Sequence, residues 1–117
     1  MVTTTLTTHV RELTGNTSVI EIKGEVNAQA EKALMDAYNQ VTGKGAHNIL
    51  LDFSQLEYMN SSGIGLLVTL LIRVKRQNQR LLACGLSDHY RQIFDLTRLN
   101  EAITIYPTTQ DALAALK

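Results

Sequence analysis

The sequence predicts an α/β domain with a mixed β-sheet, made of an opening hairpin followed by strands that alternate with helices. Two β-branched, partly alternating segments, residues 4–13 and 18–23, flank turn-forming residues at 14–17 and indicate the hairpin. The later apolar strands are separated by segments with helical spacing, an order that favours parallel pairing. At 117 residues the chain is long enough to bury one core, so we expect a single domain, 1–117, with about four helices packed against the sheet.

The first helix is expected directly after the hairpin. Asn27 is a good N-cap residue, and Gly43 and Gly45 are typical of a helix end. Residues 48–53 then form an almost continuous apolar run, which is typical of a strand that is buried on both faces. Residues 54–59 are interpreted as a loop. The apolar positions of the first helix recur at helical spacing: Ala30, Leu34, Ala37, Tyr38 and Val41.

The second half repeats the alternation of helix and strand. A long helix is predicted from the apolar run 64–74, followed by a strand at 80–84. A short helix begins at Ser87, a last strand covers 103–106, and the capping box 108–111 opens a terminal helix. The apolar sides of these two later helices are expected to be Ile93, Phe94 and Leu96, and Ala112, Leu113 and Leu116.

The basic residues Arg73, Lys75 and Arg76 lie in the last turn of the long helix. Cations are favourable there because the helix dipole is negative at its C-terminus. A surface for a partner or a nucleic acid is the alternative interpretation of the same charges.

The most informative stretch is 58–65, where paired hydroxyls precede the long helix. Asn60 or Ser61 can act as its N-cap, which places the neighbouring hydroxyl near the surface at the positive end of the helix dipole. Gly63 and Gly65 each cost about 1 kcal/mol of helix propensity, so we expect something to approach the backbone closely. At Gly65 a partner and the chain's own sheet are equally good candidates, whereas at Gly63 we favour a partner.

Composition argues against several classes of function. Eleven basic residues balance eleven acidic ones, and aromatic residues are only 5% with no Trp, so we expect no direct nucleic-acid or anionic-membrane partner. The apolar run 64–72 is too short to span a membrane, and the N-terminus does not resemble a signal peptide. Cys84, the single cysteine, ends an apolar strand and is interpreted as a core residue. A cytoplasmic protein is therefore expected.

The residues needed for catalysis do not come together in the sequence. His9, His47 and His89 lack the spacing of metal ligands on one helix, so neither a metal nor another cofactor is predicted. A serine hydrolase elbow would need glycine where Met59 or Asn60 stands. No base is positioned to activate a hydroxyl, so the exposed serine is more plausibly acted upon than acting. Nucleotide binding at the helix N-terminus stays a minor alternative.

Five segments of the chain resemble a known family. Residues 24–26, 52–54, 58–67, 81–86 and 93–99 are similar to the corresponding segments of the anti-sigma factor antagonists, or STAS domains. The Ser61-Ser62-Gly63 sequence is the most specific part of this resemblance. A single STAS-like domain without enzymatic activity is implied over the whole chain.

The resemblance also implies a mechanism of regulation. A kinase that is itself an anti-sigma factor would phosphorylate Ser61, and a serine phosphatase would reverse this. The unphosphorylated form would bind the kinase and free the sigma factor, which regulates transcription. The expected partner-binding residues are Asn27, Asn60, Ser61, Ser62, Gly63, Ile64 and Gly65.

The chain departs from the family at two positions of this surface. Many phosphorylated members carry aspartate where this chain has Asn27 and Asn60. Asparagine caps a helix about as well as aspartate, so only the negative charge beside Ser61 is lost. The alternative function is a non-switching STAS-like scaffold or docking subunit of a transport or signalling complex, and the sequence leaves the oligomeric state open.

Overall fold

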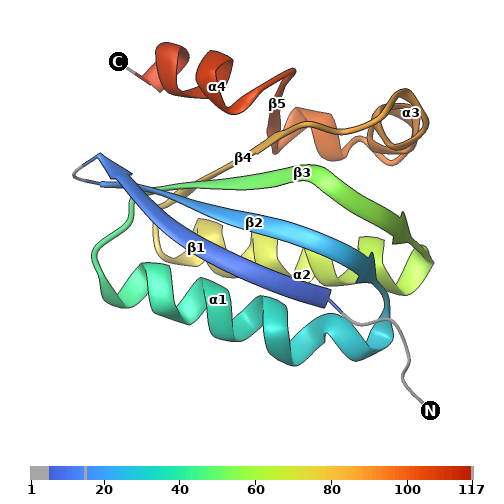
Figure 1. The fold of residues 1–117 in the computed structure, drawn as a ribbon, viewed down its shortest axis with the longest axis horizontal. Coiled ribbons are helices and arrows are strands. Elements are labelled where there is room, and N and C mark those ends of the chain that lie inside the picture. The colour runs from blue at the N-terminus through green and yellow to red at the C-terminus, as the bar shows by residue number, and fades with distance from the viewer. Residues whose placement is uncertain (1–5, 15, 117) are drawn as a thin grey trace.

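The computed structural model describes residues 6–14 and 16–116, which form a five-stranded mixed sheet in the order β1-β2-β3-β4-β5 (Figure 1). β1 pairs antiparallel with β2, and each later neighbour pairs in parallel. The predicted hairpin and mixed sheet are thereby confirmed, although residues 4 and 5 lie outside the described residues. The strands are β1 (Leu6–Thr14), β2 (Thr17–Val26), β3 (Asn48–Met59), β4 (Arg80–Cys84) and β5 (Thr104–Tyr106).

Four α-helices connect and cover the strands. α1 and α2 lie together on one face of the sheet, and α4 lies on the opposite side (Figure 1). Short 3-10 turns, η1 (Ala28–Ala30) and η2 (Leu99–Glu101), precede α1 and follow α3. None of the helices in the described ranges is long and apolar enough to cross a membrane. The helices are α1 (Glu31–Gly43), α2 (Ser61–Arg76), α3 (Asp88–Leu96) and α4 (Thr109–Leu116).

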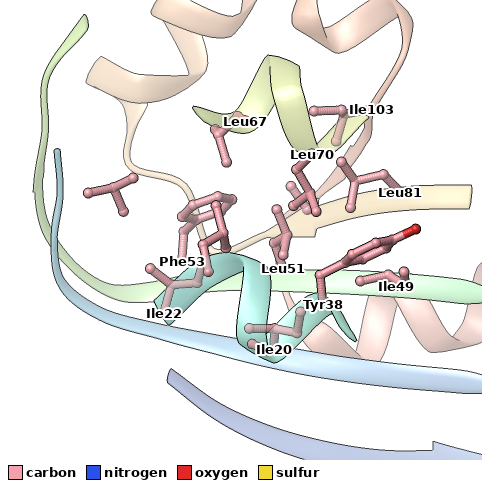
Figure 2. Close-up of a cluster of buried hydrophobic side chains, with 14 of the residues drawn as sticks. Ile20, Ile22, Tyr38, Ile49, Leu51, Phe53, Leu67, Leu70, Leu81 and Ile103 are labelled. Atoms are coloured by element: carbon pink, nitrogen blue, oxygen red, sulfur yellow. The ribbon is translucent and has the colours of Figure 1, made fainter. Parts of the chain in front are cut away.

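The sheet is buried on both faces over much of its area, as the apolar strands predict. The larger cluster lies between the strands and α1 and α2, where Ile20, Leu51 and Phe53 meet Leu67 and Leu70 (Figure 2). A smaller cluster lies beneath α4: Val19, Leu50, Leu82, Cys84 and Ala112. Neighbouring residues of one strand therefore belong to different clusters, because successive side chains point to opposite faces.

Two predictions about the strands and helices are wrong. Residues 54–59 do not form a loop, because β3 continues to Met59 and pairs with β2 as far as the pair Val26–Met59. Leu96 does not belong to the apolar side of α3, since 84% of its side chain is exposed. Tyr90 and Phe94 are the buried pair, four residues apart on one side of the helix.

Candidate functional site

The candidate site is the tip, defined here as Asn27 together with residues 60–65. Its two parts follow β2 and β3, which are parallel neighbours and end at the same edge of the sheet, where Val26 pairs with Met59. The backbone N–H of Asn60 donates a hydrogen bond to the Val26 carbonyl at 3.3 Å. The topology therefore brings Asn27 next to the start of α2, although the two are far apart in sequence.

Both asparagines of the tip are N-caps. Asn60 Oδ1 accepts a hydrogen bond from the Gly63 N–H at 2.9 Å, which settles the choice between Asn60 and Ser61 as the cap of α2. Asn27 Oδ1 accepts from the Gln29 N–H at 3.0 Å and caps η1. In each carboxamide the oxygen accepts the capping hydrogen bond. The NH₂ group, which can only donate, remains available for other hydrogen bonds.

Ser61 is the first residue of α2, and its side chain is exposed, as is that of Ser62. The first N–H groups of a helix have no intrahelical acceptor, and the helix dipole is positive at this end. The first turn of α2 contains no acidic residue. The surroundings of the Ser61 hydroxyl therefore favour negative charge.

The two glycines of the tip differ in what surrounds them. A Cβ on Gly63 would lie 2.8 Å from the carbonyl carbon of Val26 and 2.9 Å from Met59 Cγ, and closer still to the Val26 carbonyl oxygen. A Cβ on Gly65 would meet no atom within 4 Å. Gly63 is thus required because α2 packs closely on β2. The sequence analysis favoured a partner at this position and placed packing second. Gly65 is the glycine whose backbone is open to a partner.

Two tyrosines near the tip were assigned no role in the sequence analysis. The buried Tyr90 hydroxyl accepts a hydrogen bond from the Met59 N–H at 2.8 Å, which anchors the last residue of β3 just before the tip. Tyr58 is 51% exposed on the same strand. The Tyr90 contact spans 31 residues, so no local pattern could have indicated it.

The remaining chemically active groups do not assemble into a second site. Burial raises the pKa of the Cys84 thiol to about 11, and Cys84 Sγ lies 3.4 Å from Thr109 Oγ1 beneath α4. A thiol with this pKa is protonated at neutral pH and is a poor nucleophile. Within the residues that the structure describes, no three His, Cys, Asp or Glu side chains gather in a way that could hold a metal ion.

Comparison with known proteins gives one consistent result. The family model of the STAS domain matches residues 9–112. An anti-sigma-B factor antagonist of Staphylococcus epidermidis is 23% identical over 91 residues, which cover 78% of this chain and 84% of that protein. One from Listeria monocytogenes is 27% identical over 86 residues, 74% of this chain and 75% of that protein.

Solved structures agree with this result. The crystal structure of an anti-sigma factor antagonist from Mycobacterium paratuberculosis has a TM-score of 0.80 at 26% identity, and the match covers 94% of this chain and 92% of that one. Bacillus SpoIIAA in its phosphorylated form has a TM-score of 0.74 at 20% identity, covering 95% of this chain and all of the other, which shows a common fold.

Proposed function

Since this chain belongs to the STAS domain family, we propose that it is an anti-sigma factor antagonist whose tip binds an anti-sigma factor kinase and is switched by phosphorylation of Ser61. The observation that carries this proposal is the exposed Ser61 hydroxyl at the first residue of α2, on a backbone fixed by Asn60 and Gly63. The names of the similar proteins from Staphylococcus and Listeria support the assignment. A role in the cytoplasm, in control of transcription and without catalysis, is part of the same proposal.

The switch follows from charge on a closely fitted surface. Phosphorylation adds about −1.5 to −2 charges and three acceptor oxygens at one point of the tip. A partner surface that fits the bare Ser61 and the uncovered backbone at Gly65 has no room and no solvation for this group. The unphosphorylated form therefore binds the kinase, the phosphorylated form dissociates, and a serine phosphatase restores binding.

Asn27 and Asn60 determine whether this chain or the kinase disfavours the complex of the phosphorylated form. A phosphate on Ser61 would lie at the start of α2, beside the Asn60 carboxamide and at the sheet edge that carries Asn27, and these groups are uncharged donors or favour an anion. With aspartate at the same places it would instead meet like charges, a repulsion of about 1 kcal/mol per pair near a surface. Rejection of the phosphorylated form must therefore come from acidic or apolar groups of the kinase.

Phosphate transfer from ATP by purified anti-sigma factor kinases of the host tests the assignment, with the modified residue located by mass spectrometry. We expect labelling of wild type and of the matched control Ser62→Ala, and none of Ser61→Ala. Labelling of Ser61→Ala together with its loss in Ser62→Ala would contradict the assignment. Equal kinase binding by the phosphorylated and unphosphorylated proteins would favour the second candidate function, a non-switching scaffold. This function stays a candidate because Asn27 and Asn60 lack the negative charge that many phosphorylated members of the family carry at these positions.

Ser61→Asp separates binding from folding. An acidic residue near a helix N-terminus stabilises the fold by about 0.3–1 kcal/mol. We therefore expect this variant to lose kinase affinity while its melting temperature stays equal or rises. Lost binding with a lowered melting temperature would instead indicate misfolding.

A further inference from the structure

The outward side of α2 is unusually apolar for a helix that covers a sheet. Among the described residues four large hydrophobic side chains are exposed, and two of them, Val68 at 40% and Ile72 at 49%, lie on this helix. A third, Tyr58, lies just before the tip. A surface helix normally places polar side chains opposite its buried side. Single exposed apolar residues need no explanation, but Val68 and Ile72 lie on the helix that begins at the candidate site.

The exposed residues of α2 form one line. Ser61, Gly65, Val68 and Ile72 are spaced by four, three and four residues, so they follow one another along one side of the helix, and we call them the outer stripe. The buried residues of α2 lie on the opposite side: Gly63, Leu67, Leu70 and Val74. The stripe runs about 16 Å from Ser61 to Ile72, at 1.5 Å per residue. It therefore extends the tip along the helix.

Beyond Ser61, the outer stripe carries no polar side chain. The Thr69 hydroxyl beside it donates to the Gly65 carbonyl at 3.1 Å, within the helix. Gly65 presents no side chain, and its Cβ position is open. By contrast α1, on the same face of the sheet, exposes polar residues and an internal ion pair between Lys32 and Asp36 at 2.7 Å. Of the two helices on this face, only α2 therefore exposes large apolar side chains.

The far end of the stripe is basic. Arg73, Lys75 and Arg76 occupy the last turn, and α2 contains no acidic residue. The ion pairs found among the described residues involve none of these three cations. The surface is therefore polarised, with an apolar centre and an unneutralised basic end, and a complementary surface has an apolar centre and an acidic edge.

We propose that the outer stripe is the second half of the kinase-binding surface, and that it docks into an apolar groove of the anti-sigma factor kinase whose rim is acidic near Arg76. This inference rests on the proposed function and adds to it a second contact region beyond the phosphorylated serine. The tip provides the switch and the stripe provides affinity, because apolar anchors at the centre of an interface dominate its binding energy.

Equilibrium binding of the unphosphorylated protein to the kinase that labels Ser61 tests the inference. Ile72→Glu puts a charge at the apolar centre, and Arg76→Glu reverses the basic end. The matched control Leu96→Glu makes the same change as Ile72→Glu on α3, where the side chain is 84% exposed. Lys32→Glu on α1 is the matched control for Arg76→Glu.

We expect Ile72→Glu to weaken binding roughly tenfold or more, since charge in the apolar centre of an interface is strongly unfavourable. Arg76→Glu should weaken binding several-fold at low salt and reduce its salt dependence. Both controls should bind within about twofold of wild type, and all four variants should keep the wild-type melting temperature within a few degrees, as expected for surface substitutions.

Three outcomes would overturn the inference. If Ile72→Glu binds like wild type while Ser61→Asp does not bind, the tip alone is the interface and only the stripe is wrongly assigned. If light scattering shows a wild-type dimer that Ile72→Glu converts to a monomer with unchanged kinase affinity, the stripe is covered by a second copy. Failure of the wild-type protein to bind any anti-sigma factor kinase would overturn the proposed function and the inference together.

Discussion

Gly63 and Gly65 are only two positions apart at the start of α2, yet substitution by alanine should have opposite effects on stability at the two positions. Alanine gains about 0.8–1.0 kcal/mol of helix propensity over glycine at either place. At Gly65 nothing opposes this gain, because the Cβ would have no neighbour within 4 Å. At Gly63 the Cβ would lie 2.8 Å from the Val26 carbonyl carbon, whereas real Cβ atoms essentially never approach another atom below 3.0 Å.

Relief of that clash requires α2 to move away from β2, since the obstructing atoms are backbone. Such a movement also stretches the hydrogen bond between the Asn60 N–H and the Val26 carbonyl. Overpacking of this kind costs about 1–3 kcal/mol. After the gain in helix propensity is subtracted, we expect Gly63→Ala to lower the free energy of unfolding by up to about 2 kcal/mol, and Gly65→Ala to raise it by up to about 1 kcal/mol.

Urea unfolding and thermal melting of the two variants measure this difference directly. The two variants differ by the overpacking cost of about 1–3 kcal/mol, and for a domain of this size 1 kcal/mol corresponds to about 3–5 °C, so their melting temperatures should differ by about 3–15 °C. Similar melting temperatures for the two variants would refute the close approach of α2 to Val26. A kinase-binding assay adds a second test, because Gly65→Ala should be the more stable protein and yet bind less well.

Three other results are expected. Tyr90→Phe should lower the free energy of unfolding by about 1–3 kcal/mol, because the buried Met59 N–H loses its acceptor; an unchanged urea midpoint would contradict that bond. The pKa of the Cys84 thiol is raised by burial to about 11, so the thiol favours folding below its unfolded pKa of about 8.5 and loses this contribution as pH rises toward 11. Between about pH 8.5 and about pH 11 the melting temperature of the wild type should therefore fall more steeply with pH than that of Cys84→Ala. Parallel curves of melting temperature against pH would contradict the raised pKa of Cys84. Asn60→Asp should lower the melting temperature of the Ser61-phosphorylated protein more than that of the unmodified one, and equal shifts would mean that position 60 does not sense the phosphate.

Local signals in the sequence were enough to predict most of the fold. Strand and helix periodicity identified the hairpin and the strands that follow it, because side-chain spacing reports which faces are buried. The Asn60 cap was among the predicted alternatives for the same reason, since capping depends on a few neighbouring residues. The meeting of Asn27 and Asn60 also follows from a general rule, as parallel strands end at one edge of the sheet.

Features that depend on distant contacts could not be predicted. Residues 54–59 were interpreted as a loop, but pairing with β2 keeps them in a strand, although most of their side chains are exposed. Leu96 matches an apolar pattern, but the position of α3 is set by Tyr90 and Phe94, which face β3. The roles of Gly63 and Gly65 became distinguishable only when the Val26 backbone was in place.

The arrangement of the tip explains how a charge on Ser61 can change binding without changing the fold. The contacts that fix the tip are the Asn60 cap, the Gly63 approach to Val26 and the Met59 bond to Tyr90, and the Ser61 hydroxyl takes part in none of them. Phosphate therefore adds charge to a surface that is held by other groups. Because the Asn60 carboxamide and the N-terminus of α2 both favour an anion, we expect the phosphorylated domain to be at least as stable as the unmodified one. Under the proposed switch, the free-energy difference between the two states would then lie almost entirely in the complex, where the kinase would have to leave the new charge unsolvated or release the tip.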